Sequence, residues 1–244
     1  MHNPTLRVLE VMELLCNSEV PLRLSDISRQ LNVPKSTLLP ILQTLSEKRC
    51  ISKNAYEQYL PGPELMALGS AAGKFYSPGE HIRFCLKTLV DRFGETCYYG
   101  VPDGGDVLYL EKVDSPQPLR MLTSIGHRLP AYATGIGKAL LMDKTKEELQ
   151  ALYPAELKPL TKNTIKDLTV LFNQLREAKI LGYTMEVEES TEHIRCFAVP
   201  LRSGGKIVGA VSIAFPIFRF KPEQQDKIIE ALKQTAAEIE AGLR

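Results

Sequence analysis

Apolar residues recur at helical spacing in two adjacent segments within residues 21–53. The first segment carries Ile27 and Leu31, four residues apart, with Ser25 as a candidate N-cap. The second carries an apolar stripe formed by Leu38, Ile41, Leu42 and Leu45. Between them, Asn32-Val33-Pro34 supplies a turn. The pattern therefore predicts two helices joined by a tight turn, as in a helix-turn-helix.

The flanking segments predict the rest of a small domain over residues 1–61. A further helix is predicted after Pro4, with its apolar side formed by Leu6, Leu9, Met12 or Glu13, and Cys16. Residues 50–53 and 56–60 read as strands around an Asn54-Ala55 turn. Together these elements predict a winged helix-turn-helix, with the hairpin as its wing.

Residues 62–78 differ from their surroundings, because they combine apolar and small residues with few charges. They predict a linker helix that ends at Ser77-Pro78-Gly79. A helix of this composition cannot bury both faces alone, so self-association through it is a second interpretation.

Residues 79–244 alternate between helical and strand patterns. Helices are predicted at 80–93, 134–142 and 221–243, and two more are expected after Thr145 with Glu148 and after Thr164 with Asp167. Strands are predicted at 96–101, 107–113, 119–124, 183–187, 194–201 and 207–215. Consecutive hairpins at 102–106 and 203–205 favour an antiparallel sheet over strand-helix-strand crossovers. The expected class is α+β, with an antiparallel sheet flanked by helices.

Composition narrows the possible partners. The chain of 244 residues is 44% hydrophobic and 24% charged, which suits two globular domains. A formal net charge of +1 excludes a global basic field, so contact with DNA must depend on local placement of cations. The five cysteines form no CxxC pair, no secretory signal precedes them, and no apolar run reaches membrane-spanning length. We expect a soluble cytoplasmic protein with reduced thiols and no membrane association.

The helix after the turn carries the candidate DNA contacts. Lys35, Ser36 and Thr37 occupy its first turn, where a recognition helix reaches base edges and phosphates. Arg29 and Lys53 are candidate phosphate contacts that would set the register. The alternative is a solvated helix end at which a hydroxyl caps the helix.

Three stretches together resemble the IclR family of bacterial transcriptional regulators: the winged helix, GHRLPAYATGIGKALL (126–141) and GYTMEVEESTEHIRCFAVPLRSGGKIVGAVSIAFP (182–216). The resemblance spans nearly the full chain. It implies an N-terminal winged helix, a linker helix over 62–78 and a GAF-like domain over 79–244 that binds a small effector, often a carboxylic acid. It also implies a homodimer or homotetramer that binds a double-stranded DNA operator.

The resemblance also implies which residues line the effector cavity. Carried over position by position, they are Met121, Leu129, Gly135, Ile136, Glu186, Ile194, Cys196, Ser212 and Ala214. This chain departs from the common pattern at Glu186, His193, Phe197 and Ala214, and Pro40 interrupts the recognition helix. A buried Glu186 would repel a bare carboxylate, which favours an effector that also carries a hydroxyl or amine donor.

Other chemical interpretations of these residues are weaker. Gly135-Ile136-Gly137-Lys138 lacks the flanking residues of a nucleotide-binding loop, leaving anion binding or close helix packing. A thiol nucleophile at Cys196 with His193 as its base is disfavoured, because residues three apart on a strand face opposite sides. Glu186, Glu188 and Glu189 lack the spacing of a metal site.

The sequence thus predicts a ligand-responsive DNA-binding regulator that is not an enzyme and has no cofactor or metal. Two alternatives stay open. One is a small-molecule enzyme with an appended helical domain that uses Cys196 or Glu186. The other is a protein-interaction module that binds partners through the apolar linker helix and the C-terminal helix.

Overall fold

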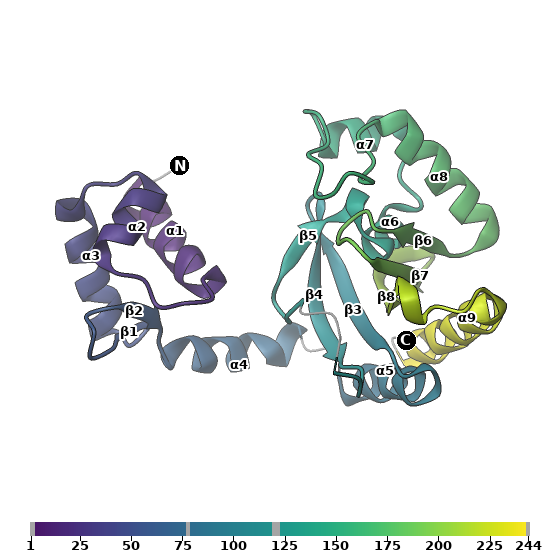
Figure 1. Ribbon diagram of the computed structural model, residues 1–244, viewed down its shortest axis with the longest axis horizontal. Helices are drawn as coiled ribbons and strands as arrows, with labels where there is room; N and C mark the ends of the chain where they lie inside the picture. Colours follow the sequence, from purple (N-terminus) through teal and green to yellow (C-terminus); the bar gives the residue numbers. More distant parts are fainter. Residues whose placement is uncertain (1–2, 77–78, 119–122, 243–244) are drawn as a thin grey trace. The chain divides into compact units, whose positions relative to one another are not determined.

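The computed structural model describes residues 3–76, 79–118 and 123–242, which fall into two compact units (Figure 1). The first unit is Met1–Ser77 and the second is Pro78–Arg244. The helix predicted as a linker is therefore counted with the first unit. The functional division at 61 and 78 stays a prediction.

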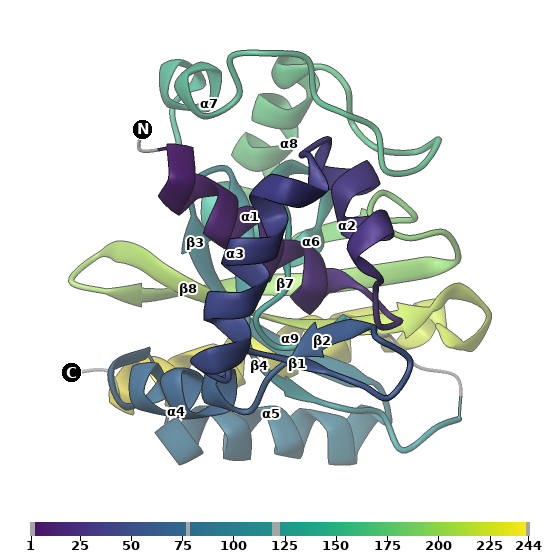
Figure 2. The same cartoon turned by 90° about the vertical axis from the view of Figure 1, so that its left-hand side faces the viewer.

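The first unit is a three-helix core with a short hairpin and one further helix. Its elements are α1 (Asn3–Asn17), α2 (Leu24–Leu31), α3 (Lys35–Glu47), β1 (Ile51–Lys53), β2 (Tyr59–Pro61) and α4 (Glu64–Tyr76). Figure 2 shows α1, α2 and α3 packed around one another. Ile27, Leu38 and Leu42 are buried in this core, as their spacing predicts.

The buried face of α1 differs from the prediction. Val11 and Leu15 are buried, whereas Leu9 is 53% exposed and Cys16 is exposed. Both series of residues have helical spacing, so the sequence pattern could not choose between them. The choice depends on the angle at which α1 packs against the other helices.

Two local predictions in this unit are wrong. Arg23, not Ser25, is the N-cap of α2, and its backbone N–H donates to the Asp26 carboxylate at 3.1 Å. The wing turn is longer than Asn54-Ala55, because Lys53 pairs directly with Tyr59. The Asn54 side chain accepts hydrogen bonds from backbone N–H groups at both Tyr56 and Gln58, which closes a wider loop.

Helix α3 continues through Pro40. Pro40 is exposed, and its carbonyl accepts a hydrogen bond from the Thr44 hydroxyl at 2.9 Å. Proline has no N–H, so the turn before it lacks one backbone donor. That gap lies on the solvent side of the helix, away from the buried stripe.

The second unit is built on a six-stranded antiparallel sheet with strand order β5-β4-β3-β8-β7-β6. Its strands are β3 (Thr96–Asp103), β4 (Asp106–Val113), β5 (Arg128–Pro130), β6 (Thr184–Val187), β7 (Ile194–Ser203) and β8 (Lys206–Pro216). Its α-helices are α5 (Gly79–Phe93), α6 (Gly135–Leu141), α7 (Lys146–Leu152), α8 (Leu168–Leu181) and α9 (Gln225–Gly242). The α+β class and the antiparallel sheet are confirmed.

The two faces of the sheet differ in the size of their side chains. Large residues such as Phe197, Ile213 and Phe215 share one core with residues of α5 and α9. Ala198, Ala210 and Ala214 alternate with them and share the opposite core with residues of α6. Figure 1 shows α5 and α9 together on one side of the sheet, with α6 and α8 on the other. The small side chains leave room for α6 to approach the strands closely.

In this unit the sequence predicted the glycine turns of the hairpins more reliably than the positions of the short strands. The hairpins close at Gly104–Gly105 and Gly204–Gly205, where Gly104, Gly204 and Gly205 have positive φ. The predicted strand at 119–124 lies largely outside the described residues, and Thr123 and Ser124 are not in a strand. The sequence pattern missed β5, which has three residues.

Of the two helix caps predicted in the second unit, one was predicted correctly. Thr145 and Glu148 form the expected capping box. Asp167, not Thr164, caps α8, and its carboxylate accepts backbone N–H groups two and three residues later. The last α-helix begins at Gln225, after a 3₁₀ turn at Pro222–Gln224, rather than at 221.

Candidate functional site

The predicted DNA-contact residues lie on the exposed start of α3. Lys35 and Ser36 are exposed and Thr37 is partly buried. Pro34 is the N-cap, and no side chain makes a cap hydrogen bond to this helix. The alternative in which a hydroxyl caps the helix is therefore not observed at the described start of α3.

The two predicted phosphate contacts are each paired with a carboxylate. Arg29 contacts Asp26, with Nη2 and Oδ1 separated by 3.0 Å, and Lys53 donates to Glu57 in the wing. The hydrogen bond to Glu57 raises the pKa of Lys53. Both cations would have to exchange a carboxylate for a phosphate in order to bind DNA.

In the second unit, most of the predicted effector residues gather on the α6 side of the sheet. One apolar cluster contains Leu129, Ile136, Ile194, Cys196 and Ala214. Cross-strand pairing places Cys196 between Glu186 and Ala214, and Ser212 follows on the same face of β8. Met121 lies outside the described residues. Residues that are far apart in the sequence thus converge on one surface.

The start of α6 is held close to the strands by two glycines. A Cβ added to Gly135 would lie 3.1 Å from Cys196 Cβ, and one added to Gly137 would lie 2.3 Å from Ala131 Cα. The Thr134 hydroxyl accepts the Gly137 N–H at 2.9 Å, and the Thr184 hydroxyl donates to the Gly135 carbonyl at 2.7 Å. Close packing is therefore the role that the contacts give to these glycines.

Glu186 is a buried acid at the edge of this surface. Its carboxylate accepts the Glu189 N–H at 2.8 Å and the Ser190 hydroxyl at 3.2 Å. Burial raises the pKa of Glu186 to about 7, although the hydrogen bonds from Glu189 and Cys196 oppose this shift. Burial, followed by the nearby Glu186, raises the pKa of the Cys196 thiol well above its usual value.

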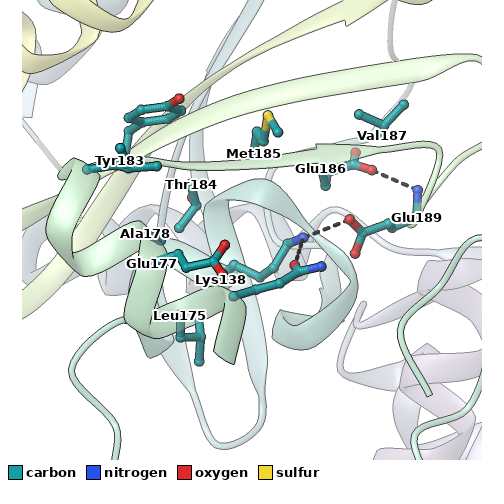
Figure 3. Close-up of a pocket in the computed structure, with 12 residues that line it drawn as sticks. Lys138, Leu175, Glu177, Ala178, Tyr183, Thr184, Met185, Glu186, Val187 and Glu189 are labelled. Carbon is teal, nitrogen blue, oxygen red and sulfur yellow. Dashed lines mark hydrogen bonds and ion pairs between the residues drawn. The ribbon is translucent and has the colours of Figure 1, made fainter. Parts of the chain in front are cut away.

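A buried ion pair between Lys138 and Glu189 lies next to Glu186. The Lys138 ammonium donates to Glu189 Oε1 at 2.7 Å and to Gln174 Oε1 at 3.2 Å (Figure 3). Lys138 is 2% exposed and lines a pocket of about 210 Å³ between α8 and β6. Sequence reasoning named this lysine only as part of the Gly135–Lys138 motif and did not predict its ion pair, although a lone charge inside the apolar run GIGKALL was the available signal.

Two tyrosines on the same surface were also missed. Tyr98 and Tyr109 are buried, with ring centroids 5.2 Å apart in an edge-to-face arrangement. The Tyr98 hydroxyl makes no well-formed hydrogen bond within the described residues, although Thr123 lies near enough to lower its pKa slightly. Burial has the larger effect and raises that pKa. A buried hydroxyl without a good partner favours a ligand atom that can pair with it.

The contacts do not favour the enzyme interpretation. The His193 side chain is 83% exposed, and its Nδ1 lies 3.4 Å from Glu188 Oε1. Cys196 instead pairs across the sheet with Glu186, and its raised pKa opposes thiolate formation. Glu188 lies beyond the end of β6 at positive φ, so strand alternation does not place it on the same face as Glu186. Within the described residues, no group of three or more His, Cys, Asp or Glu side chains could hold a metal ion.

Comparison with known proteins gives matches to both units. Residues 5–55 match the IclR helix-turn-helix domain, and residues 80–241 match the C-terminal domain of bacterial transcriptional regulator IclR. The chain is 30% identical to the HTH-type transcriptional regulator KdgR of Escherichia coli (strain K12) over 241 residues, covering 98% of this chain and 91% of that protein. No helix in the described ranges is long and apolar enough to cross a membrane.

Solved structures resemble the whole chain. The IclR of Thermotoga maritima has a TM-score of 0.78 at 27% identity, covering 100% of this chain and 99% of that one. An IclR homologue from Microbacterium hydrocarbonoxydans, solved in complex with 4-hydroxybenzoate, has a TM-score of 0.85 at 23% identity, with coverages of 99% and 99%. The latter likeness shows the shared fold.

Proposed function

The chain belongs to the IclR family of bacterial transcriptional regulators, and we propose which of its residues bind the operator and which bind the effector. It is a DNA-binding regulator with an effector-binding C-terminal domain. In our proposal, residues 1–61 bind DNA, residues 62–78 link the units, and residues 79–244 form the GAF-like effector domain.

The exposed start of α3 supports the operator-binding assignment. The buried stripe of α3 packs one side of the helix against the core. Lys35, Ser36 and Thr37 form its first turn, at the end that is not packed into the core. In this proposal Lys35 contacts phosphate, Ser36 and Thr37 read base edges, and Arg29 and Lys53 fix the register. This arrangement is the single observation that carries the DNA assignment.

The α6 side of the sheet supports the effector assignment. Its small side chains, the cross-strand trio of Glu186, Cys196 and Ala214, and the buried Tyr98 hydroxyl provide both apolar and polar contacts. Glu186 is set to accept hydrogen bonds, so the proposed effector is a small organic acid that carries a hydroxyl or amine donor. The 4-hydroxybenzoate of the Microbacterium hydrocarbonoxydans homologue has that chemistry and is a suitable first probe.

The test is fluorescence anisotropy with the DNA upstream of the coding sequence, titrated first with salt and then with small carboxylic and hydroxy acids. We expect salt-dependent binding that one acid specifically changes. Lys35→Ala should weaken binding and lower the slope of log K against log salt by about 0.9. Lys166→Ala, an exposed lysine in the second unit, is the matched control. Absence of DNA binding by the folded protein at low salt would contradict the proposal.

We also propose that the protein works in the cytoplasm as a homodimer or homotetramer. Helix α4 supports self-association, because Met66 is 80% exposed and Leu68 is 56% exposed. Light scattering after size-exclusion chromatography tests this. A monomer at micromolar concentration would contradict it.

A further inference from the structure

A groove of about 600 Å³ lies in the first unit between the wing and the starts of α2 and α3. Arg23 lines it from the N-cap of α2, Lys35 from the first turn of α3, and Lys53 from the end of β1. Tyr56 and Glu57 line it from the wing loop. Arg29, which also carries a positive charge on α2, is not part of the lining. Three cations from three separate elements thus meet around one opening.

Backbone pairing brings these elements together. Leu22 and Tyr59 exchange two hydrogen bonds, with N···O distances of 2.9 and 2.7 Å, so the chain entering α2 runs beside the wing. Arg23 follows Leu22 directly, which places it next to the hairpin. Lys53 pairs with Tyr59 from the other side of β2, so Arg23 and Lys53 lie on either side of the same strand.

The three cations differ in their partners. Across the described ranges, no carboxylate forms an ion pair with Arg23 or Lys35, whereas Lys53 donates to Glu57. Glu57 has φ of +63°, and its N–H donates to the Asn54 carbonyl at 3.1 Å. The Asn54-centred loop thus positions one carboxylate beside the lysine of an otherwise cationic groove.

We propose that this groove binds a phosphate of the DNA backbone through Arg23, Lys35 and Lys53, and that Glu57 occupies the phosphate position beside Lys53 in the free protein. The inference rests on the proposed function and adds Arg23 and Glu57 to the residues that control DNA affinity. Charge complementarity selects the occupant, because three cations face a single carboxylate.

Glu57 is suited to being displaced. Its side chain is 77% exposed, and ion pairs at such positions contribute little to stability. A backbone phosphate in the groove would contact Arg23 and Lys35 as well, so it gains interactions that Glu57 does not make. Glu57 therefore lowers DNA affinity without preventing binding.

Fluorescence anisotropy of the full chain with duplex DNA tests the role of Glu57. We expect Glu57→Gln to tighten binding by about two- to fivefold. In a Lys53→Met background the same substitution should have no effect, because the lysine that Glu57 neutralises is gone. Glu47→Gln removes the same charge at the far end of α3, about 18 Å along the helix from Lys35, and is the matched control.

A second pair of variants tests Arg23. Its backbone, not its side chain, makes the cap hydrogen bond to Asp26, so Arg23→Gln should keep the fold, which circular dichroism checks. We expect Arg23→Gln to lower the slope of log K against log salt by about 0.9 on every duplex sequence. Lys48→Gln, beyond the last residue of α3, should change the slope less.

Several results would overturn the inference. An equal gain from Glu57→Gln and Glu47→Gln, or a gain that persists without Lys53, would show only a general charge effect. An unchanged slope of log K against log salt in Arg23→Gln would remove the groove from the DNA interface. A polyglutamate peptide that competes only at the groove would identify an acidic peptide as its occupant. These results leave DNA binding by the wild-type protein intact. Failure of the wild-type protein to bind any duplex would instead overturn the proposed function itself.

Discussion

The second unit contains a chain of buried polar contacts that runs from α6 to the proposed effector surface. Lys138 is bonded to the Glu189 carboxylate, the Glu189 backbone N–H is bonded to Glu186, and Glu186 lies opposite Cys196 on the next strand. Each buried charge in this chain has a partner, which offsets part of its desolvation cost. The sequence indicated Glu186 and Cys196 through a family resemblance. Spacing could not indicate the contact of Lys138 with Glu189, because fifty-one residues separate them.

Glu186 should make stability depend on pH. Its pKa is about 7 in the folded protein, above the ordinary value of 4.5, so the folded state binds the proton more tightly than the unfolded state. The added stability is fully present below pH 4.5 and is lost as the pH rises through 7, by up to about 3 kcal/mol. Urea unfolding of the wild-type protein between pH 5 and 8 should show this decline, and Glu186→Gln should reduce it.

Glu148→Gln is the control for that measurement. Hydrogen bonds from the Thr145 backbone and Lys144 lower the pKa of Glu148, so it stays ionised throughout the range. Glu148→Gln should leave the dependence of the free energy of unfolding on pH between 5 and 8 as it is in the wild-type protein. If the free energy of unfolding changed equally with pH in the wild-type protein and in Glu186→Gln, the assignment of the pH dependence to Glu186 would be contradicted.

The buried ion pair predicts a large loss of stability when one partner is removed. Lys138→Met leaves Glu189 without its cation in the protein interior, which should cost about 3–5 kcal/mol in the free energy of unfolding. Lys144→Met breaks an exposed pair with Glu148 and should cost less than about 1 kcal/mol. Urea unfolding at pH 7 measures both. Similar losses in the two variants would show that burial of the Lys138 pair has no special effect.

At the scale of elements, local chemistry predicted turns and helices more reliably than the faces and ends of helices. The glycine pairs at both hairpins and the Thr145 capping box depend on neighbouring residues, and all were predicted correctly. The buried face of α1 and the start of α8 depend on packing, and both were predicted incorrectly. Thr164 is the predicted cap, but its hydroxyl donates to the Glu189 carbonyl at 2.6 Å, a contact between distant segments.

Two glycines in helices should respond oppositely to the same substitution. Gly137→Ala places a Cβ against the Ala131 backbone and should destabilise the second unit by about 1–3 kcal/mol or more. Gly69→Ala in α4 meets nothing within 4 Å and should stabilise its helix by about 0.5–1 kcal/mol. Thermal unfolding by circular dichroism compares them. A tolerated Gly137→Ala would show that α6 can move away from Ala131.

At the scale of the whole molecule, each unit has its own apolar core and its own candidate site. Among the described residues, one apolar cluster lies in the first unit and three lie in the second. The proposed DNA-contact residues and the proposed effector residues therefore do not share a core. Coupling between them requires that the effector bind differently to DNA-competent and DNA-incompetent states.

This separation predicts complementary variants. Ser212→Val should abolish the effect of the active acid on DNA affinity and leave affinity without the acid unchanged. Lys35→Ala should weaken DNA binding and keep the thermal stabilisation given by the acid, which is about 2.7 kcal/mol at a hundred times the dissociation constant. Anisotropy and thermal shift, measured on the same preparations, test both. A Ser212→Val protein that still responds to the acid would place the effector elsewhere.

The sequence by itself determined the α+β class, the helix-turn-helix, the glycine turns of the second unit and the family, because these depend on local periodicity, turn residues and motifs. Only the tertiary structure decided which residues come together: Lys138 with Glu189, Tyr98 with the α6 side of the sheet, and Arg23 and Lys53 around one groove of the first unit. The physical reason is that these contacts join segments far apart in the chain. Their partners are selected by strand register and helix packing, which no local pattern encodes.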